Sequence, residues 1–585
     1  MIPFGDYIPD ANPFMSGGAT KANNVIPNSD GYRALPNFAS RSDALTNEAR
    51  GLFTSFAIDE NGKTDTTLFS GDKAKLYKYG SAQTWSNVSI AAGYDGLDTE
   101  NDRTYWSFTQ FGTNIFATNY VNPIQQFDLD NSSLFANITT TTGTAPQAKY
   151  MATVKDFLMT GFTKEYQTAK TFDSNAIAAN AITITAHGWL TGYTVVYDNN
   201  GNTSLTNLTD GSVYYVIKID ADTIKLATSR ANAIAGTVIT LSATGGSETH
   251  KLQQYTVNKQ RVRWSGLNDT ATWEDGGQSS QSDFQDLVSA VGPITGLIGG
   301  EYLTIITERS IIRGTYVGTP LVFQFDKAAD NLGSFAPRSI TAWGRLVFFL
   351  SDDGFYMFDG INVKPIGANK VNKYFFNDLI GAKLDGICAA IDPKNTTVMW
   401  SYAGEGFDGS TNNKLMIYNY SLDRWSTGEI DFEFMNTSAQ EAFSLDALDE
   451  ISTDLDSLPY SLDSWAWLDG DIGIGGFNGS HKFGKLAGTN ATATIDTTEF
   501  EGAKGRRSTL TSATPIIDGG TTTVTPITRA SQADGQTVGT AVSMTDTGTT
   551  PIRSTSRFHR LRCTSTGSFT TLKGVDVSAR PEGLR

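Results

Sequence analysis

The side chains that most often carry catalysis or bind metals are few in this sequence and lie far apart. The 585 residues include four histidines and two cysteines. No histidine belongs to a His-Glu-x-x-His pattern or stands beside a cysteine pair, so the sequence has no local zinc signature. The cysteines are too few for a disulfide framework and are expected to be buried thiols. These residues are His187, His250, His481, His559, Cys388 and Cys563.

Two glycine- and asparagine-rich motifs begin like ligand-binding loops, but each lacks a required residue. In GIGGFNG (473–479), Asn478 stands where the dinucleotide fingerprint needs its last glycine. The segment YDNNGN starts like a calcium loop at Asp198. However, its glycine comes too early, at Gly201, and its twelfth position is Thr209 instead of glutamate. Both motifs are expected to be turns, and the sequence predicts no cofactor and no bound metal.

Paired carboxylates are the remaining route to catalysis, because two acids at a suitable separation hydrolyse glycosidic bonds. Among 61 acidic residues, the segments WEDG (273–276) and SDDG (351–354) are the obvious candidates. Asp-Gly sequences are also typical of tight turns, since glycine adopts left-handed dihedral angles without steric cost. Both segments are expected to be turns. The chain is therefore predicted not to be an enzyme.

The SDDG segment lies inside a strand–turn–strand pattern that recurs along the chain. In LVFFLSDDGFYMFDG (346–360), an apolar run without alternation predicts a strand buried on both faces. Weaker copies span 67–80, 106–119, 150–162, 302–316, 398–420 and 472–488. Most neighbouring turns are roughly 40 to 65 residues apart, which is typical of four-stranded propeller blades. With 57 glycines and only 18% charged residues, the sequence predicts an all-β protein. Its core is expected to be β-propeller-like, with about seven blades; six or eight stay open.

One interval in this repeat, between residues 156 and 308, is too long for a single blade and is expected to hold an insertion. Residues 174–253 form the predicted small β domain, and 255–264 resume the interrupted blade. Its expected strands are 181–185, 194–197, 213–219, 223–227 and 238–241. The other predicted parts are an extended N-terminal arm (1–50), the two halves of the propeller (51–173 and 254–494) and a C-terminal β-rich domain (495–585). An acidic loop at 441–464 suits a solvated loop, with cation binding as the alternative.

The two ends of the chain differ in composition. The first 50 residues are rich in Pro, Asn and Gly, and their scattered aromatic and aliphatic residues favour docking along other protein. The net charge of the whole chain is −16, which argues against general binding to nucleic-acid phosphates. Residues 501–585 nevertheless carry eleven Lys and Arg against six Asp and Glu. In FHRLRC (558–563), alternation predicts a strand with a buried face and a basic, exposed face that carries Arg560 and Arg562.

Neither a membrane span nor a secretory signal is expected. The sequence has no run of about 20 apolar residues. Its first residues, Met-Ile-Pro-Phe-Gly-Asp, have neither a basic start nor an apolar core. The protein is therefore expected to be made in a cytoplasm.

Several segments resemble the tail hub or nozzle proteins of short-tailed bacteriophages (podoviruses), also called packaged-DNA stabilisation proteins. These segments are ANNVIPNSDGYRALPNFAS (22–40), RVRWSGLNDTATWE (261–274), LMIYNYSLDRWSTGE (415–429) and HRLRCTSTGSFTTLKGVDVSARPEG (559–583). The inserted segment is similar to a β module of many phage structural proteins. The resemblance covers most of the chain, but its motifs are diffuse and none is catalytic.

The resemblance implies a structural virion protein in a phage tail, made in the host cytoplasm. It would form a homo-oligomeric ring, a hexamer or close to it, below the portal and adaptor. The ring would extend the channel for duplex DNA without binding it specifically, retain packaged DNA until ejection, and carry fibres or spikes that meet the host surface. Contacts to a neighbouring subunit or ring are expected at Arg560, Arg562, Tyr32 and Phe38. The alternatives are a carbohydrate-binding or glycan-hydrolysing propeller, and another virion part such as a fibre or adaptor.

Overall fold

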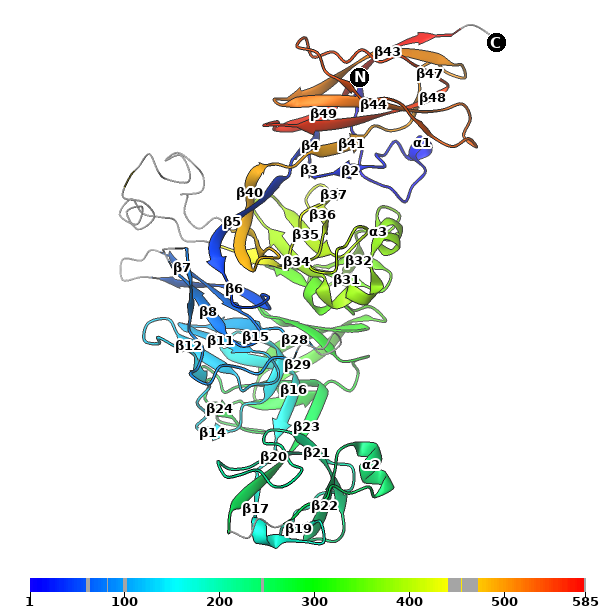
Figure 1. Cartoon of the computed structure of the whole chain (residues 1–585). Coiled ribbons are helices and arrows are strands. Elements are labelled where there is room, and N and C mark those ends of the chain that lie inside the picture. The colour runs from blue at the N-terminus through cyan, green and yellow to red at the C-terminus, as the bar shows by residue number, and fades with distance from the viewer. Residues whose placement is uncertain are drawn as a thin grey trace.

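The protein is built almost entirely of β-strands. The computed structural model describes residues 1–58, 64–80, 83–97, 103–242, 247–439, 454 and 472–582. Strands make up 51% of it and helices 5%. Figure 1 shows the core sheets in the middle of an elongated molecule, with the sheets built from both termini at one end and the inserted segment at the other. The described part has three short α-helices, α1 (Pro13–Ser16), α2 (Arg230–Ala235) and α3 (Asn372–Asp378).

Seven antiparallel units of four strands follow one another through the described core. The first unit consists of β6 (Gly51–Ile58), β7 (Thr64–Gly71), β8 (Leu76–Tyr79) and β9 (Trp85–Asn87), and the second of β10 (Ser107–Phe111), β11 (Asn114–Thr118), β12 (Gln125–Asp128) and β13 (Ala136–Asn137). The third unit consists of β15 (Gln147–Val154), β16 (Phe157–Tyr166), β23 (Thr249–Trp264) and β25 (Asp283–Asp286). The fourth consists of β26 (Ile294–Ile298), β27 (Leu303–Thr307), β28 (Ser310–Gly318) and β29 (Val322–Asp330).

The last three units show how the arm takes part. The fifth unit consists of β30 (Thr341–Trp343), β31 (Leu346–Ser351), β32 (Gly354–Phe358) and β33 (Val363–Pro365). The sixth consists of β34 (Cys388–Asp392), β35 (Thr397–Tyr402), β36 (Lys414–Asn419) and β37 (Arg424–Gly428). The seventh consists of β38 (Phe434–Ser438), β39 (Gly473–Phe477), β40 (Lys482–Asn490) and β5 (Pro36–Ala44). The strand β5 comes from the N-terminal arm, so the beginning of the chain supplies the fourth strand of the last unit.

The first strands of most successive units contact one another, and side chains join the remaining pair of units, so that the units form a closed circuit. The contacts run from β6 to β10, β15 and β26, then from β30 to β34 and β38, and from β38 back to β6. The fourth and fifth units meet through Ile298 and Ile340, which pack in one hydrophobic cluster. The last and first units are joined by the Asn436 side chain, whose Nδ2 donates to the Leu52 carbonyl at 2.8 Å. This arrangement buries the faces of each unit against its neighbours.

The recurrent hairpins predicted from the sequence are confirmed as antiparallel strand pairs. They are β7–β8, β10–β11, β15–β16, β27–β28, β31–β32, β35–β36 and β39–β40. The strand β31 is buried along its length except at the half-buried Leu346, as its unalternated apolar run predicts. At the following turn, Gly354 has a φ of +150°, and a Cβ there would lie 1.8 Å from Asn372 Nδ2. No side chain fits in that position without a rearrangement.

The N-terminal arm is docked, as its apolar residues predict. Its strand β2 (Ala22–Asn23) lies between β37 and β41 (Ala493–Asp496), which links the sixth unit to β48 (Phe558–Thr566) and β44 (Thr521–Arg529) in one sheet. A second terminal sheet contains β1 (Ile2–Pro3), β3 (Val25–Asn28), β4 (Gly31–Ala34), β49 (Thr571–Pro581), β43 (Ser508–Asp518) and β47 (Ser554–Ser556). One hydrophobic cluster includes Trp400 and Trp425 of the core together with Leu561 and Val575 of the C-terminal part. The two ends of the chain therefore share a core with the sixth unit.

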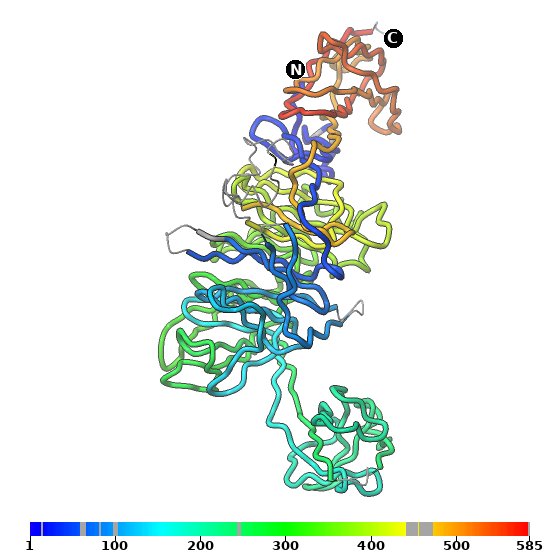
Figure 2. Tube along the Cα trace, turned by 60° about the vertical axis from the view of Figure 1, so that its left-hand side comes forward, coloured from blue at the N-terminus to red at the C-terminus, as the bar shows by residue number. Residues whose placement is uncertain are grey.

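The inserted segment stands away from the rest of the molecule. Figure 2 shows two neighbouring stretches of chain leading to it, and β16 and β23 pair along this neck. Its strands are β17 (Lys170–Asp173), β18 (Ile177–Ala178), β19 (Ala181–Thr183), β20 (Thr194–Asp198), β21 (Val213–Lys218) and β22 (Thr223–Ala227). A separate hydrophobic cluster, formed by residues between Phe172 and Leu252, fills it. An insertion with its own core needs few contacts to the host sheet.

One predicted strand of the insertion is wrong. Residues 238–241 form no strand. Before them, the short helix α2 begins at the N-cap Ser229 and ends at Gly236, whose φ is +74°. Ile239 and Leu241 are buried in the cluster of the insertion, but Ile239 makes one backbone hydrogen bond to Leu226 without joining a ladder. The alternating apolar residues that predicted a strand therefore serve packing alone.

Two further expectations from the sequence concern the acidic loop and a membrane-spanning helix. The acidic loop at 441–464 lies outside the described residues except for Asp454. In the part of the chain that the structure describes, no helix is long and apolar enough to span a membrane.

Candidate functional site

The expectation of a basic, exposed face on the strand that carries Arg560 and Arg562 is wrong. Arg560 is only 5% exposed, and its Nη1 donates to Thr20 Oγ1 of the arm at 2.9 Å. Both arginines lie beside Asp496, with Arg562 Nε 2.7 Å from Oδ1 and Arg560 Nη1 3.8 Å from Oδ2. The N-terminal arm covers this face of β48, and the buried Asp496 carboxylate pairs with both arginines. Strand alternation could not reveal a cover that comes from the other end of the chain.

The two predicted interface residues of the arm have different surroundings. Tyr32 is fully buried, and its hydroxyl donates to the Gly5 carbonyl at 2.8 Å. Burial raises the pKa of Tyr32 above its usual value. Phe38 is half-buried and packs edge-to-face on Phe432, with ring centroids 5.4 Å apart. Of the four predicted interface residues, only Phe38 and Arg562 therefore retain partly exposed side chains.

Three of the four histidines and the glycine-rich motif at 473–479 occupy structural positions. His187 accepts from the Trp189 amide at Nδ1, at 2.9 Å, within a turn. His250 is fully buried beside the Tyr197 hydroxyl, and His559 is buried beside Ser508. Of the segment GIGGFNG, which is expected to be a turn, residues 473–477 form β39, and only its end forms the turn into β40. Among the described residues, no three His, Cys, Asp or Glu side chains are grouped so as to hold a metal ion.

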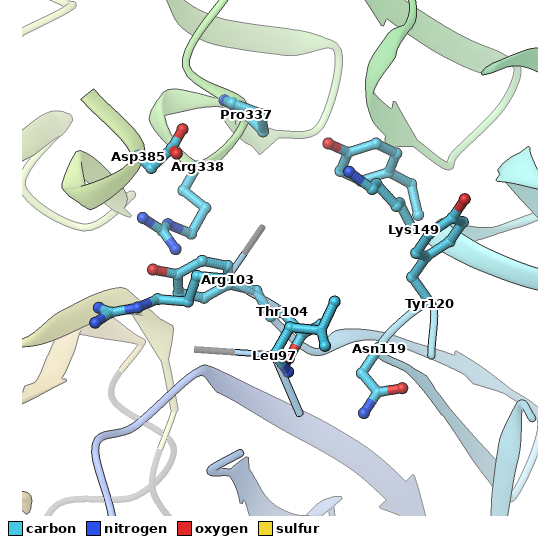
Figure 3. A pocket seen from close by; sticks show the side chains of 11 residues that line it. Leu97, Arg103, Thr104, Asn119, Tyr120, Lys149, Pro337, Arg338 and Asp385 are labelled. Carbon is cyan, nitrogen blue, oxygen red and sulfur yellow. Dashed lines mark hydrogen bonds between the residues drawn. The ribbon is translucent and has the colours of Figure 1, made fainter. Parts of the chain in front are cut away.

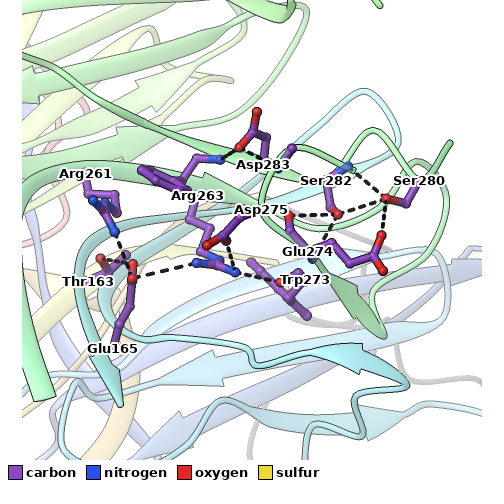
Figure 4. A network of polar contacts seen from close by, with 12 residues as sticks. Thr163, Glu165, Arg261, Arg263, Trp273, Glu274, Asp275, Ser280, Ser282 and Asp283 are labelled. Atoms are coloured by element: carbon purple, nitrogen blue, oxygen red, sulfur yellow. Dashed lines mark hydrogen bonds and ion pairs between the residues drawn. The ribbon is translucent and has the colours of Figure 1, made fainter. Parts of the chain in front are cut away.

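The WEDG segment contributes to an ionic network at the base of the neck (Figure 4). Asp275 Oδ1 lies 2.7 Å from Arg263 Nη2, and Glu165 Oε2 lies 2.9 Å from Arg261 Nη1. Arg261 also makes two hydrogen bonds to Asp286, of 2.7 and 2.8 Å, which lower the pKa of that carboxyl. Pairing with Arg261 favours the ionised form of the Asp286 carboxyl, which does not suit a general acid.

The other residues of this network also favour a structural role. Glu274 Oε2 accepts from the Ser280 hydroxyl at 3.3 Å, and Arg263 Nη2 donates to the Trp273 carbonyl at 2.6 Å. The network joins β16, β23 and β25 with the loop at 273–282, where the inserted segment leaves the core. The SDDG acids are also turn residues, since Tyr356 donates to Asp353 at 2.7 Å and Arg309 lies 3.4 Å from Asp352.

Two adjoining cavities lie where segments that precede the first strands of several units converge, and together they are called the central cavity here. They measure about 190 and 360 Å³ and share Arg103, Tyr105, Arg338 and Asp385. Leu97 and residues 103–105 precede β10, 337–338 precede β30, and 382–386 precede β34. No motif in the sequence marks these residues, because they come from separate units and meet only when the circuit closes.

The position of Tyr105 is fixed by the residue that follows it. Trp106 is 7% exposed, and its indole nitrogen donates to the Asp72 carbonyl at 2.7 Å. Gly71 allows this contact, since a Cβ there would lie 2.3 Å from Trp106 Cδ1. Tyr105 consequently lies in the cavity wall, and the Arg338 guanidinium carbon is 3.3 Å from the centroid of its ring. Figure 3 shows Arg338 near Asp385 in the wall of this cavity.

The first part of the central cavity is rich in hydrogen-bond donors. Arg338 Nε and Nη1 and Asn119 Nδ2 are buried and have no hydrogen-bond partner within the described chain. Lys149 Nζ lies 4.5 Å from the centroid of the Phe162 ring and 5.4 Å from that of Tyr120. Burial lowers the pKa of the Arg338 guanidinium, while the nearby Cys388 and Asp385 raise it. An arginine keeps its charge even so.

The second part of the cavity holds a carboxylate–imidazole pair. Glu433 Oε2 lies 2.5 Å from His481 Nδ1, and its other oxygen accepts from the Ala49 amide, also at 2.5 Å. Burial raises the pKa of the Glu433 carboxyl to about 7, although the Ala49 amide and His481 oppose that rise. Glu48, which binds Arg103 at 2.7 Å, lines the same space.

Comparisons with known proteins give only distant likenesses. No family model matches the chain, and no curated protein matches it. Apo AztD from Citrobacter koseri is 10% identical with a TM-score of 0.28, and the match covers 68% of this chain and 95% of that protein. A second AztD crystal structure gives 9% and 0.28, over 70% and 96% of the two chains. The phage phi92 endosialidase gives 11% and 0.21, over 82% of this chain and 64% of that one. Likenesses with such low TM-scores carry no argument about function.

Proposed function

We propose that this protein is a structural subunit of a short phage tail, in the nozzle or hub ring. In this proposal the closed circuit of seven four-stranded units is a seven-bladed β-propeller, which acts as a rigid body. The subunits form a ring of about six below the portal and adaptor and continue the channel for duplex DNA. The sequence resemblance supplies this role, and the architecture of the chain is compatible with it.

The observation that carries the proposal is the separation of the inserted segment from the core. The segment has its own hydrophobic cluster and stands at one end of the elongated molecule on two paired strands (Figure 2). The ionic network of Glu165, Arg261 and Arg263 fixes the base of those strands. A module held out in this way suits contact with a second component, such as a fibre or spike, while the core assembles into the ring.

The charge of the chain supports the same role. A channel through which duplex slides should not bind phosphate tightly, because each neutralised phosphate adds affinity. The net charge is −16, and the basic C-terminal part has its two predicted surface arginines paired with Asp496. A lumen that is neutral or negative is therefore expected.

The test is the mass of the purified protein in solution, alone and mixed with the portal–adaptor complex of its phage. A ring of about six copies on the complex is the expected result. A matched variant replaces residues 168–253 with a short turn between Gln167 and Gln254, whose backbones already form a hydrogen bond of 2.9 Å. This variant should still form the ring but lose the fibre or spike. Failure of the full chain to bind the complex would refute the proposal.

A second candidate, a carbohydrate-binding protein, is favoured by one observation. The central cavity is lined by Tyr105, Tyr120 and Tyr150, and tyrosine rings can stack on sugars. Retention of the protein on a polysaccharide column, together with no binding to the portal–adaptor complex, would favour this candidate over the nozzle.

A further inference from the structure

We propose that the central cavity binds a small organic oxyanion, a carboxylate or a phosphate ester, through the Arg338 guanidinium. This inference goes beyond the proposed tail role, since a ring subunit would assemble with or without such a ligand. It rests on the unpaired donors of the cavity, on the rigid support of Arg338 and on the aromatic wall beside it.

Arg338 differs from the other arginines that have buried, unpartnered nitrogens. Arg50 donates to the Leu97 carbonyl at 2.8 Å, and Arg560 donates to Thr20 and lies near Asp496. Arg263 and Arg424 form ion pairs with Asp275 and Asp6, each at 2.7 Å, and Arg41 has a partner as well. Among the described residues, Arg338 has no ion-pair partner, and its buried Nε and Nη1 have no hydrogen-bond partner. A buried cation without a counterion is costly, so a ligand that supplies the missing acceptors would bind there favourably.

The cavity offers further donors for the same ligand. Asn119 lines it, and its Nδ2 has no partner within the described chain, whereas its Oδ1 accepts from the amides of Val121 and Asn122. Lys149 also lines this part of the cavity and adds a second cation. The one acidic residue among the described residues that line this part is Asp385, which is exposed. Donors in excess of acceptors favour an anion over a neutral ligand.

Hydrogen bonds hold the backbone that carries Arg338, and the Tyr105 ring holds its guanidinium, so the donor is positioned before any ligand arrives. The Ser339 hydroxyl donates to the Ala336 carbonyl at 2.7 Å and accepts from the Leu350 amide at 3.1 Å. Trp400 Nε1 donates to the Ser339 carbonyl at 3.0 Å. These bonds fix both sides of the short turn at 337–339. A preorganised donor loses little entropy on binding.

The aromatic wall indicates the shape of the ligand. Tyr105 covers one face of the guanidinium, and Tyr120 and Leu97 provide apolar surface near Asn119 (Figure 3). A guanidinium covered on one face still offers hydrogen bonds in its own plane, which suits a planar carboxylate or a phosphate. The two volumes suit a small molecule rather than a polymer segment. An oxyanion attached to a ring-shaped body fits these walls.

The test is isothermal titration calorimetry of the full chain at low ionic strength, with D-glucuronate, D-glucose 6-phosphate, inorganic phosphate and D-glucose as separate probes. At least one of the two sugar anions should bind, while glucose should not. Tighter binding of glucuronate would identify a carboxylate ligand, and tighter binding of the phosphate ester would identify a phosphate ligand. Equal binding of glucose, or no binding of either sugar anion, would overturn the proposal.

Variants locate the binding at Arg338. R338Q should weaken binding at least about tenfold, because hydrogen bonds to charged groups are among the strongest, and R338K should retain part of the affinity. D385N should strengthen binding severalfold, which loss of folding could not produce. The matched control is R345Q, at a residue of an exposed turn whose side chain is 72% accessible. An R338Q variant that binds the sugar anions as tightly as R345Q does would contradict the proposal. If R338Q does not fold, the affinities of D385N and R338K for the same probes test the proposal instead.

Discussion

Two arginines with buried guanidinium nitrogens differ in how their charge is compensated. Arg560, near the C-terminus, lies in a sheet interior beside Asp496 and under Thr20 of the N-terminal arm. Arg338, in the wall of the central cavity, stacks on Tyr105 and has no counterion in the described chain. The first arginine is part of the joint between the two chain ends. The second is positioned like a binding residue whose counter-charge comes from outside.

The comparison separates residues that serve stability from residues that serve binding. A compensated buried ion pair is strongly destabilised when one partner is removed, because the other charge remains buried. An uncompensated charge weakens the fold already, so its removal should cost little. The following four predictions test this difference in order of expected effect.

The largest effect is expected for D496N. This change leaves Arg560 and Arg562 without their counterion, in a site where Asp496 is 1% exposed. Unfolding in urea, followed by tryptophan fluorescence, should show a loss of about 3–5 kcal/mol. A loss as small as that of the control R345Q would mean that the arm and the sheet hold the arginines without the carboxylate.

A pH-dependent effect of intermediate size is expected from Glu433. Its pKa is raised by burial to about 7, so between pH 5 and 7 the folded protein keeps a proton that the unfolded chain has lost. The free energy of unfolding should therefore fall as the pH rises from 5 to 8, by roughly 1–3 kcal/mol from this group. Melting temperatures at several pH values should show a flatter profile for E433Q, because the side-chain amide of that variant does not titrate. An unchanged slope in E433Q would assign the dependence to other groups.

Replacing Arg338 should have little effect on stability. R338M replaces the guanidinium over Tyr105 by an uncharged thioether and so removes the unpaired charge. The free energy of unfolding should stay within about 1 kcal/mol of the wild type or rise. The same urea experiment measures it beside D496N. A loss of several kcal/mol would make Arg338 a structural residue like Arg560 and remove the contrast between them.

The smallest effect is expected at the exposed pair of Arg345 and Glu301. Their side chains are 72% and 60% accessible and lie 2.8 Å apart. Surface pairs of this kind contribute about 0–1 kcal/mol, so R345Q should unfold almost as the wild type does and should lose its small difference in high salt. A larger loss of stability in R345Q would show that the pair of Arg345 and Glu301 stabilises the fold, and R345Q could then not serve as the control.

The sequence by itself determined the local β structure of this protein. The apolar run of β31, the Asp-Asp-Gly turn after it and its six weaker copies predict the hairpins, because strand alternation and turn chemistry act over a few neighbouring residues. The same locality identified the insertion and most of its strands. It failed at 238–241, where apolar residues pack on a cluster without joining a ladder.

Only the tertiary structure decided which charges are buried and which side chains meet. The burial of Arg560 depends on Thr20, 540 positions away in the chain. The meeting of Arg338 with Tyr105 depends on closure of the circuit of units, in which β38 contacts β6. Neither contact follows from a local pattern, because the loops that form the cavity carry no common motif. Their side chains converge because the loops lead into the first strands of different units, which meet around the cavity.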